Sequence, residues 1–529
     1  MMNCIKFLSW FLVHSVLFLT ILTFIPGLPP HGDFLVEEIA PTTPREGPFA
    51  LNNILDRAQR HYENVFVGPE SVAYRNKPNE IFVSMHGGSI IKITGSSYSE
   101  VEEVVKIGPG CEGYWEEKVC GRPLGLRFGH DGKLLVADSY LGIFKVDVDA
   151  GTKEHLLDSK EPINGTRPMI VDDIDEDIEG NLYWSDASTI ASLDAGALEI
   201  LAGPTGRLIK TDVKTGKNIV LLDKLFFANG VQLSPKEDFV LVCETIRSRV
   251  IRYWLKGEKA GTHDVFIDGL PGHPDNIRAK PGGGYYLSLV AMKSSNSIDM
   301  IGTLLRLPWL RRLLARIGYG TTNILEMAAH YFQSQFLARV SYAVLDLATT
   351  AATFGKEGSM VVILDAEGYA KYSLQSPAGV VGSVSEATET NDMLVLGSPY
   401  NKFLAMIPLE KIKPSRSGAK PTRPIEMNLG GSLANAAGSD DKGGSPVAKD
   451  GGPAAKDGGP AAKDGGPAAK DGGPAAKVGG PAAKVGGPAA KDGGPAAKDG
   501  GPAAKDRGSA AKDGGPAAKD VGSAGKEEL

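Results

Sequence analysis

The chain has 529 residues, of which 66 are glycine and 34 are proline, and its formal net charge at neutral pH is −6. Such an excess of glycine and proline excludes a uniformly globular protein and indicates a low-complexity part. The segment from Pro446 onward carries a net charge of +2 and leaves −8 for the rest of the chain. This acidic remainder argues against a nucleic-acid-binding protein with a basic face. Four cysteines and nine histidines, with no CxxC motif, also argue against a zinc scaffold.

The first segment along the chain is an apolar run from Phe7 to Ile25 without a charged side chain. It is just long enough to cross a bilayer as a helix, and no small-residue cleavage site follows it, which favours a signal anchor over a cleaved signal peptide. Lys6 precedes the run and acidic residues follow it, so the positive-inside rule predicts a short cytoplasmic stub. We expect stub and anchor over residues 1–30 and a linker over 31–51. The protein is then a single-pass type II membrane protein of the endoplasmic reticulum or plasma membrane, with its body luminal or extracellular.

An extracytoplasmic body permits disulfide bonds and N-glycosylation. Cys111 and Cys120 are nine residues apart around a loop, and we predict a bridge between them. Cys243 lies in an apolar run and is predicted to be a buried free thiol. The one sequon begins at Asn164, where we predict glycosylation.

Between residues 52 and 413, a short β-rich run recurs six times. The runs are 81–85, 134–138, 182–186, 239–244, 285–289 and 393–397. About ten residues before each run lies a second signature, and turn-forming residues stand between most of the pairs. The alternative is a β-sandwich with coincidental spacing, but the constant offset favours an all-β, six-bladed β-propeller. A long gap before the last run holds a helical insertion over about 299–352.

The second signature locates a candidate metal site, because the first strand of every propeller blade lines the central channel. One fixed place on that strand holds Glu70, Leu124, Asp172, Asn229, Asp275 and Ser383. Three carboxylates at one point would repel one another without a cation, whereas Ca²⁺ takes six to eight oxygen ligands. We therefore predict a Ca²⁺ site that uses Glu70, Asp172, Asn229 and Asp275. The adjacent Asn276 and Asp173 are expected either to be further ligands or to support the ligands. The alternative is that each of these residues only forms a turn.

The insertion has its own pattern, since residues 304–317 place Trp309 and four arginines among apolar side chains. This pattern predicts a basic amphipathic helix that rests on a membrane surface or covers the channel. Packing against the blades is the alternative.

The end of the chain, over residues 414–529, is a low-complexity tail with heptad repeats from 446. It has almost no large apolar side chains, so we expect a disordered spacer or surface coat whose partner is unknown. The last four residues, Lys526 to Leu529, resemble an endoplasmic reticulum retrieval signal and also fit the register of the last heptad.

Several motifs resemble the strictosidine synthase-like family. They are Gly68-Pro69-Glu70-Ser71, the runs 119–125, 206–209, 229–235, 239–245 and 251–257, and Pro274-Asp275-Asn276-Ile277-Arg278. The resemblance covers residues 52–409 and implies a six-bladed propeller and a disulfide between Cys111 and Cys120. In the paraoxonase-like branch it also implies a catalytic Ca²⁺, held by the residues that match Glu70, Asp172, Asn229 and Asp275.

The resemblance points to two activities. Plant members condense an amine with an aldehyde through a glutamate, but the matching place here is Ser385, and Glu386 beside it should face the other way. Animal relatives imply hydrolysis of aryl esters or lactones. We therefore expect a calcium-dependent hydrolase in which water or Asp275 attacks the carbonyl group. His86, on a rim loop, is the candidate base, although a loop histidine without a role is the alternative; His273 is equally ambiguous. The other hypotheses are a non-catalytic ligand- or partner-binding propeller and a condensing enzyme.

Overall fold

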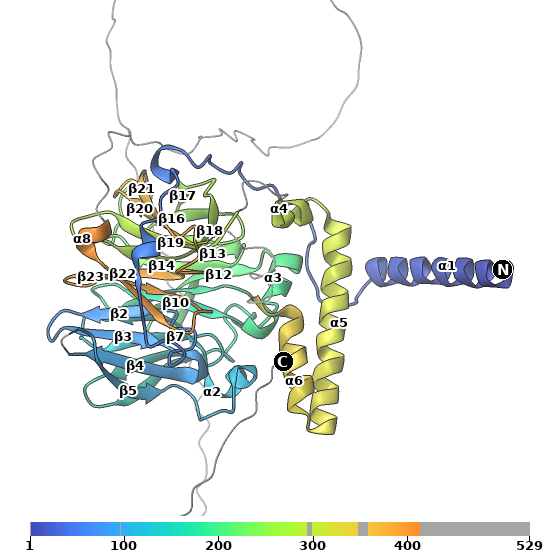
Figure 1. Ribbon diagram of the computed structural model, residues 1–529, viewed down its shortest axis with the longest axis horizontal. Helices are drawn as coiled ribbons and strands as arrows, with labels where there is room; N and C mark the ends of the chain where they lie inside the picture. The colour runs from blue at the N-terminus through green and yellow to red at the C-terminus, as the bar shows by residue number, and fades with distance from the viewer. Residues whose placement is uncertain (1, 96, 294–298, 348–357, 413–529) are drawn as a thin grey trace, which may run out of the picture. The chain divides into compact units, whose positions relative to one another are not determined.

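The computed structural model describes residues 2–95, 97–293, 299–347 and 358–412. The predicted tail over 414–529, with its heptads and its terminal Lys-Glu-Glu-Leu sequence, lies outside the described residues. The body that precedes it is mostly β-structure, as the repeat predicted, and Figure 1 shows its strands beside a smaller group of helices.

The strands β1 to β24 form six four-stranded antiparallel sheets. The first sheet holds β2 (Val72–Arg75), β3 (Glu80–Ser84), β4 (Ser89–Thr94) and β5 (Glu100–Lys106), and the second holds β6 (Pro123–Phe128), β7 (Leu134–Asp138), β8 (Gly142–Asp147) and β9 (Thr152–Asp158). The third holds β10 (Val171–Glu176), β11 (Asn181–Asp186), β12 (Gly206–Asp212) and β13 (Lys217–Leu225), and the fourth holds β14 (Ala228–Leu233), β15 (Phe239–Glu244), β16 (Arg249–Trp254) and β17 (His263–Ile267). The fifth holds β18 (Gly272–Ala279), β19 (Tyr285–Met292), β20 (Met360–Leu364) and β21 (Ala370–Gln375), and the sixth holds β22 (Glu386–Glu389), β23 (Met393–Gly397), β24 (Leu404–Pro408) and β1 (Gln59–His61).

The repeated runs of the sequence coincide with the second strand of each sheet, from β3 to β23. The first strands contact one another in the order β2, β6, β10, β14, β18 and β22, and β22 contacts β2 again, so they form a ring. The sixth sheet is completed by β1, which comes from the beginning of the body and pairs antiparallel with β24. Main-chain hydrogen bonds between the two ends of the body therefore close the ring.

Apolar side chains of neighbouring sheets pack between them in separate clusters. Between the second and third sheets, Ala137 and Leu135 pack with Trp184, which is fully buried. The indole N–H of Trp184 donates a 2.8 Å hydrogen bond to Thr211 Oγ1, so its one polar atom is satisfied. Because each sheet is covered on both faces, its strands read as short continuous apolar runs in the sequence. The prediction that Cys243 is buried and free is confirmed.

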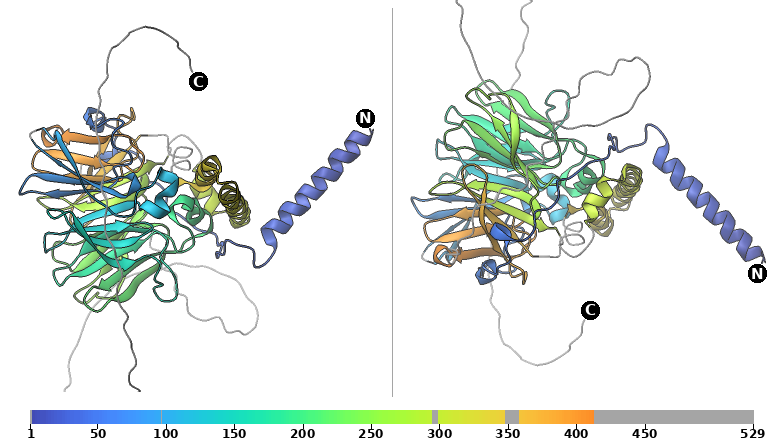
Figure 2. Two further views of the ribbon diagram at one scale, coloured as in Figure 1. Left: turned by 90° about the horizontal axis from the view of Figure 1, so that it is seen from below. Right: turned by 90° about the horizontal axis from the view of Figure 1, so that it is seen from above.

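Helices and short turns connect the strands. The helices are α1 (Met2–Phe24), α2 (Glu117–Cys120), α3 (Ala197–Ala202), α4 (Met300–Leu305), α5 (Pro308–Phe332), α6 (Gln335–Leu345) and α8 (Leu409–Ile412). Single 3₁₀ turns are η1 (Gly47–Phe49), η2 (Leu55–Arg57), η3 (His86–Gly88), η4 (Tyr114–Glu116) and η5 (Leu193–Ala195). The insertion between β19 and β20 contributes α4, α5 and α6, which lie together on one side of the sheets in both views of Figure 2.

The prediction of one continuous helix over 304–317 is wrong. The chain leaves the helical path after Leu305, and α5 starts at Pro308. Proline lacks the N–H group that a helix interior needs but suits a first turn, so Pro308 ends one helix and begins the next. The basic face is also smaller than predicted. Arg311 is fully buried and donates to Leu35 O at 3.1 Å, and Arg316 donates to Leu22 O at 2.7 Å.

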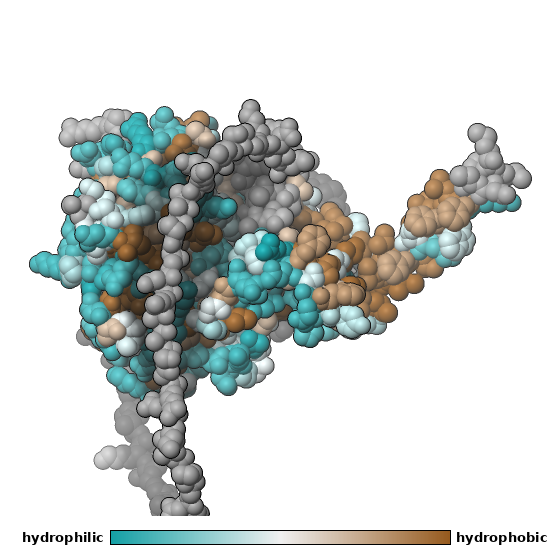
Figure 3. All heavy atoms as spheres, turned by 60° about the horizontal axis from the view of Figure 1, so that its bottom comes forward, coloured by the Kyte–Doolittle hydropathy of each residue, from teal (hydrophilic) through white to brown (hydrophobic). Residues whose placement is uncertain are grey.

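The N-terminal helix α1 contains a stretch, Lys6–Phe24, that is long and apolar enough to cross a membrane. Figure 3 shows its surface covered by apolar side chains. The segment over 31–51, predicted to be a linker, packs along the body instead: Phe34 and Phe49 are buried, and Thr43 N donates to Gly269 O at 2.8 Å. Apolar burial and main-chain hydrogen bonds therefore hold this segment in place.

A buried carboxyl group in α3 predicts a measurable pH dependence of stability. Glu199 is fully buried, accepts hydrogen bonds from Thr205 and Ser188, and has no cation partner among the described residues; burial raises its pKa from 4.5 to about 7. The protonated folded form is favoured, so this stabilising contribution is complete below pH 4.5 and is lost as the pH rises through 7. At pH 8 the buried charge costs on the order of 3 kcal/mol. Glu199→Gln should therefore be more stable than the parent at pH 8 and about equal at pH 5 in thermal melts. The exposed Glu154→Gln should show no such difference, and an equal effect of Glu199→Gln at both pH values would refute the argument.

Candidate functional site

Irregular register in the first strands brings the predicted ligands together. The pairing of β10 with β11 shifts between Val171 and Ile174, and the same irregularity recurs in β14 and β18. At such a bulge, extra residues re-aim the side chains away from the regular alternation. Asp172, Asn229 and Asp275 all lie at these irregularities. Neighbouring first strands also approach closely there, since a Cβ at Gly230 would lie 2.6 Å from Asn276 Cα.

Four of the predicted ligands line one cavity of about 230 Å³ inside the ring of first strands. They are Glu70, Asp172, Asn229 and Asp275, and each is at most 6% exposed. Burial, together with repulsion from the other carboxylates, raises the pKa of Asp172 and Asp275 well above the ordinary value. Burial likewise raises the pKa of Glu70 to about 7, although Arg122 beside it lowers the value. Without a cation, these carboxyl groups resist ionisation.

Unsatisfied acceptors mark the same place. Asn229 Oδ1, Asp275 Oδ1 and Asn276 Oδ1 are buried and have no hydrogen-bond partner in the part of the chain that the structure describes. An unpaired buried oxygen is unfavourable, and a cation would satisfy all three. The donor set consists of oxygens only, which suits a hard cation such as Ca²⁺. Among the described residues, no group of three or more His, Cys, Asp or Glu side chains is placed to hold a metal ion. A calcium site here would therefore also need the amide oxygens of Asn229 and Asn276 as ligands.

The prediction for Asp173 as a further ligand is not supported, because its carboxylate is used elsewhere. Asp173 forms an ion pair with Arg278 at 2.6 Å and accepts from Val231 N at 2.7 Å. Arg278 in turn pairs with Glu386 at 2.6 Å. This buried network connects the first strands of four sheets, β10, β14, β18 and β22, and supports the residues that line the cavity.

The cavity wall beside Glu70 is built from a charged cluster. Arg122 donates to Glu70 Oε2 at 3.0 Å and to Gly68 O at 3.1 Å. Glu117, from α2, accepts from His86 Nδ1, and the other ring nitrogen of His86 lies 3.1 Å from Pro399 O. Both nitrogens of His86 therefore face oxygen atoms, and these contacts hold the ring in the cavity wall.

His273 presents a different arrangement. Its Nδ1 lies 3.0 Å from Thr245 O, whereas Nε2 has no hydrogen-bond partner among the residues described. Burial lowers the pKa of His273 to about 4, so the ring is neutral near pH 7 and Nε2 is the unprotonated nitrogen. Since His273 lines the cavity, its Nε2 is an acceptor without a competing partner among the described residues.

The rest of the cavity lining is mainly apolar, and part of it comes from helices. The lining includes Leu193, Ile200, Phe227, Ile246, Met292, Met300, Ile301, Tyr342, Leu347 and Tyr400. Four of these residues come from helices: Ile200 from α3, Met300 and Ile301 from α4, and Tyr342 from α6. The sequence pattern did not locate them, because the insertion shares no period with the sheets.

Comparisons with known proteins decide the family. Two family descriptions match the sequence: "Strictosidine synthase" over residues 172–258 and "Strictosidine synthase-like, N-terminal" over residues 47–93. Adipocyte plasma membrane-associated protein Hemomucin of Drosophila melanogaster is 34% identical over 412 residues, which cover 76% of this chain and 69% of the relative. The adipocyte plasma membrane-associated protein of Salmo salar is 33% identical over 401 residues, with 75% and 88% covered. The chain belongs to the strictosidine synthase-like family.

Among solved structures, a gluconolactonase from Xanthomonas campestris matches with a TM-score of 0.41 and 12% identity, covering 73% of this chain and 99% of that chain.

In this strictosidine synthase-like protein, the sixth place on the ring is Ser385 and not the predicted Ser383. Ser385 N donates to Gly397 O, and its hydroxyl group donates to Glu70 O at 2.9 Å. Ser383 is only partly buried and lies before the strand. The prediction was wrong because the sequence offset does not distinguish the two serines. Glu386 faces away from the cavity, toward Arg278 and Ser71 Oγ, as predicted from strand alternation.

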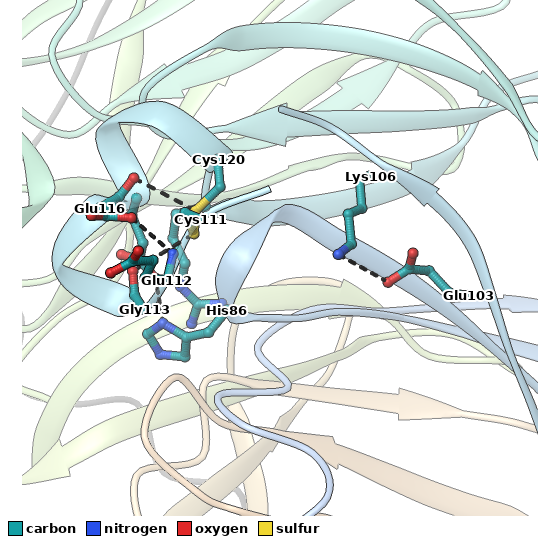
Figure 4. Close-up of a disulfide and its surroundings, with 10 residues drawn as sticks. His86, Glu103, Lys106, Cys111, Glu112, Gly113, Glu116 and Cys120 are labelled. Carbon is teal, nitrogen blue, oxygen red and sulfur yellow. Dashed lines mark hydrogen bonds and ion pairs between the residues drawn. A yellow bond between two sulfur atoms is a disulfide. The ribbon is translucent and has the colours of Figure 1, made fainter. Parts of the chain in front are cut away.

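The disulfide between Cys111 and Cys120 is confirmed. Figure 4 shows it closing the loop beside His86, where Glu116 and Glu112 also lie. Since α2 ends at Cys120, the bridge fixes the short helix that carries Glu117, the partner of His86 and Arg122. Asn164 is exposed between β9 and β10, and its glycosylation stays a prediction.

Proposed function

We propose that this family member is a membrane-anchored, calcium-dependent hydrolase of aryl esters or lactones, and that its six sheets are the blades of a six-bladed β-propeller. One observation carries the proposal. Carboxyl groups with raised pKa values and buried acceptors without donors converge in a cavity whose remaining lining is mainly apolar. Such a site combines a cation-binding floor with walls that suit an uncharged, hydrophobic substrate.

Glu70, Asp172, Asn229, Asp275 and Asn276 would hold Ca²⁺, which supplies polarisation of an ester or lactone carbonyl group when bound. Asp275 lines the cavity and has an oxygen without a donor, so it is placed to attack the carbonyl carbon or to orient the attacking water. His273 Nε2 is placed to accept a proton from that water. In this proposal His86 has a structural role: it lies in the cavity wall and contacts Glu117. Both of its ring nitrogens already face oxygen atoms, so a role as the base would require one of these contacts to break.

The test is hydrolysis of phenyl acetate and of a γ-lactone by the full-length protein in detergent. We expect activity in calcium, loss of at least about 100-fold after EDTA treatment, and recovery when calcium is restored. Equal rates before and after EDTA would refute the calcium-dependent reaction. No hydrolysis in calcium, combined with calcium-dependent thermal stabilisation, would favour the alternative of a non-catalytic binding protein.

We also propose that α1 spans the membrane with the body on the luminal or extracellular side, at the endoplasmic reticulum or plasma membrane. Lys6 before the apolar stretch and the disulfide in the body both support this topology. The outer face of α5 and α6 is apolar: Trp309, Ile324, Met327, Tyr331, Phe332 and Phe336 are each more than half exposed. Arg316 joins α5 to the carboxyl end of α1, so this face is continuous with the membrane-spanning helix and is proposed to rest on the same bilayer.

Brominated phosphatidylcholine tests the membrane contact, because bromine quenches only tryptophans near the acyl chains. The full-length protein is placed in nanodiscs of this lipid, and the quenching of its tryptophan fluorescence is measured. The Trp309→Phe variant should show less quenching than the parent protein. Trp254→Phe, on a strand of the fourth sheet, is the matched control and should leave the quenching unchanged. An identical response of both variants would contradict the proposed contact of α5 with lipid.

A further inference from the structure

One charged residue of the cavity lining, Lys293, has no part in the proposed hydrolytic chemistry. Lys293 directly follows β19 and is 8% exposed. Its backbone is fixed on both sides: its N–H group donates to Pro271 O at 3.0 Å, and its carbonyl oxygen accepts from Arg45 at 3.2 Å. The position of this side chain is therefore set by strand pairing and by the N-terminal segment.

The ammonium group of Lys293 has no hydrogen-bond partner in the described part of the chain. Asp299 and Asp268 attract it, but neither forms an ion pair with it, and Asp299 Oδ1 already accepts from Gly302 N at the start of α4. The other cation of the cavity, Arg122, is paired with Glu70. A buried ammonium group without an acceptor is unfavourable, and a bound anion would accept its hydrogen bonds and balance its charge.

Lys293 lies beside the first residues of β18, and Asp275 lies further along the same strand. Met292, the preceding residue, pairs with Gly272, which is three residues before Asp275 on β18. Three residues of an extended chain span at most about 10 Å, which is the upper limit of the backbone distance between Gly272 and Asp275. Apolar side chains, among them Phe227, Ile246 and Ile301, line the cavity as well. A ligand that fits has a reactive carbonyl group at one end, an apolar middle part and an anionic group at the other end.

We propose that Lys293 binds a carboxylate group of the substrate, at the end remote from the bond that is cleaved. The substrate class is then an ester or lactone that carries a carboxylate, and this part of the proposal rests on the proposed function. The binding of a carboxylate does not rest on the proposed function, since this binding requires only Lys293 and the cavity.

The first experiment measures binding without catalysis. Benzoate and benzamide have the same shape and differ in charge, and their affinities for the full-length protein in EDTA are compared by calorimetry. We expect benzoate to bind more tightly, Lys293→Met to weaken benzoate at least about 10-fold without affecting benzamide, and Lys293→Arg to retain most of the preference. Unchanged benzoate affinity in Lys293→Met, or benzoate binding that appears only with calcium, would overturn the proposal.

The second experiment separates this proposal from the proposed function. 4-Acetoxybenzoate and its methyl ester are compared as substrates in calcium. Lys293→Met should raise KM for the carboxylate ester about 10-fold or more, leave kcat close to that of the parent, and leave the methyl ester unaffected. An equal effect on both esters overturns the role of Lys293 while the hydrolase proposal stands. If the parent hydrolyses neither ester, the hydrolase proposal fails, and the calorimetric comparison still decides the role of Lys293.

Discussion

Asp275→Asn is expected to stabilise the calcium-free protein while it abolishes hydrolysis. Asp275 lies among Glu70 and Asp172 in a buried cavity, and burial and repulsion by these carboxylates raise its pKa well above 3.8. A raised pKa means that stability is lost as the pH rises above the ordinary value, because the folded protein must either keep a proton or bury another negative charge. Asparagine has the same shape and carries no charge. The Tm of the Asp275→Asn protein in EDTA at pH 8 should exceed that of the parent by roughly 2 °C or more, with a smaller gain at pH 5.

The same substitution should weaken calcium binding and reduce the rate of ester hydrolysis by about 100-fold or more, because it removes one of the few negative charges that face the cation. The stabilising effect of added calcium on Tm should shrink accordingly. Asp223→Asn is the matched control, since Asp223 is exposed on β13 and its replacement should change neither Tm nor rate. A calcium-free Asp275→Asn protein less stable than the parent would show that these carboxylates are held by unrecognised donors and do not form a cation site.

The sequence predicted the ring of first strands and four cavity residues because both depend on a repeated pattern. Asp172, Asn229 and Asp275 recur at a constant distance before an apolar run, and strand pairing converts that distance into a common position in space. The pattern was less reliable at the sixth sheet, where two serines are two residues apart and only the hydrogen bond of Ser385 N to Gly397 O identifies the correct one.

The rest of the site depends on tertiary contacts that have no period. Lys293 and His273 enter the cavity from the ends of paired strands, whereas Tyr342 comes from an inserted helix. The predicted helix over 304–317 failed at one residue, Pro308, whose local effect is stronger than the amphipathic pattern around it. For His86, sequence could identify a histidine at the rim but not the two oxygen acceptors that occupy its ring.

Arg278 is expected to be the side chain whose loss destabilises the body most. It is 4% exposed on β18 and pairs with Asp173 of β10 and with Glu386 of β22, each at 2.6 Å. Glu386 also accepts from Ser71 Oγ at 2.7 Å, so four sheets share one network. Arg278→Met would leave two buried carboxylates without their cation. Removal of one partner from a buried ion pair costs about 3–5 kcal/mol, which should appear as a lower urea midpoint in equilibrium unfolding.

A second variant distinguishes the loss of a cation from the loss of a large side chain. In the triple variant Arg278→Met, Asp173→Asn, Glu386→Gln, the methionine is unchanged but both stranded charges are removed. Since the penalty of Arg278→Met comes mainly from those charges, the triple variant should recover more than half of the lost free energy of unfolding. A triple variant as unstable as Arg278→Met would show that guanidinium packing, and not charge balance, holds the ring together at this point. Asp173 and Glu386 lie outside the cavity lining, so the triple variant leaves every proposed calcium ligand in place while it removes the charges of the network.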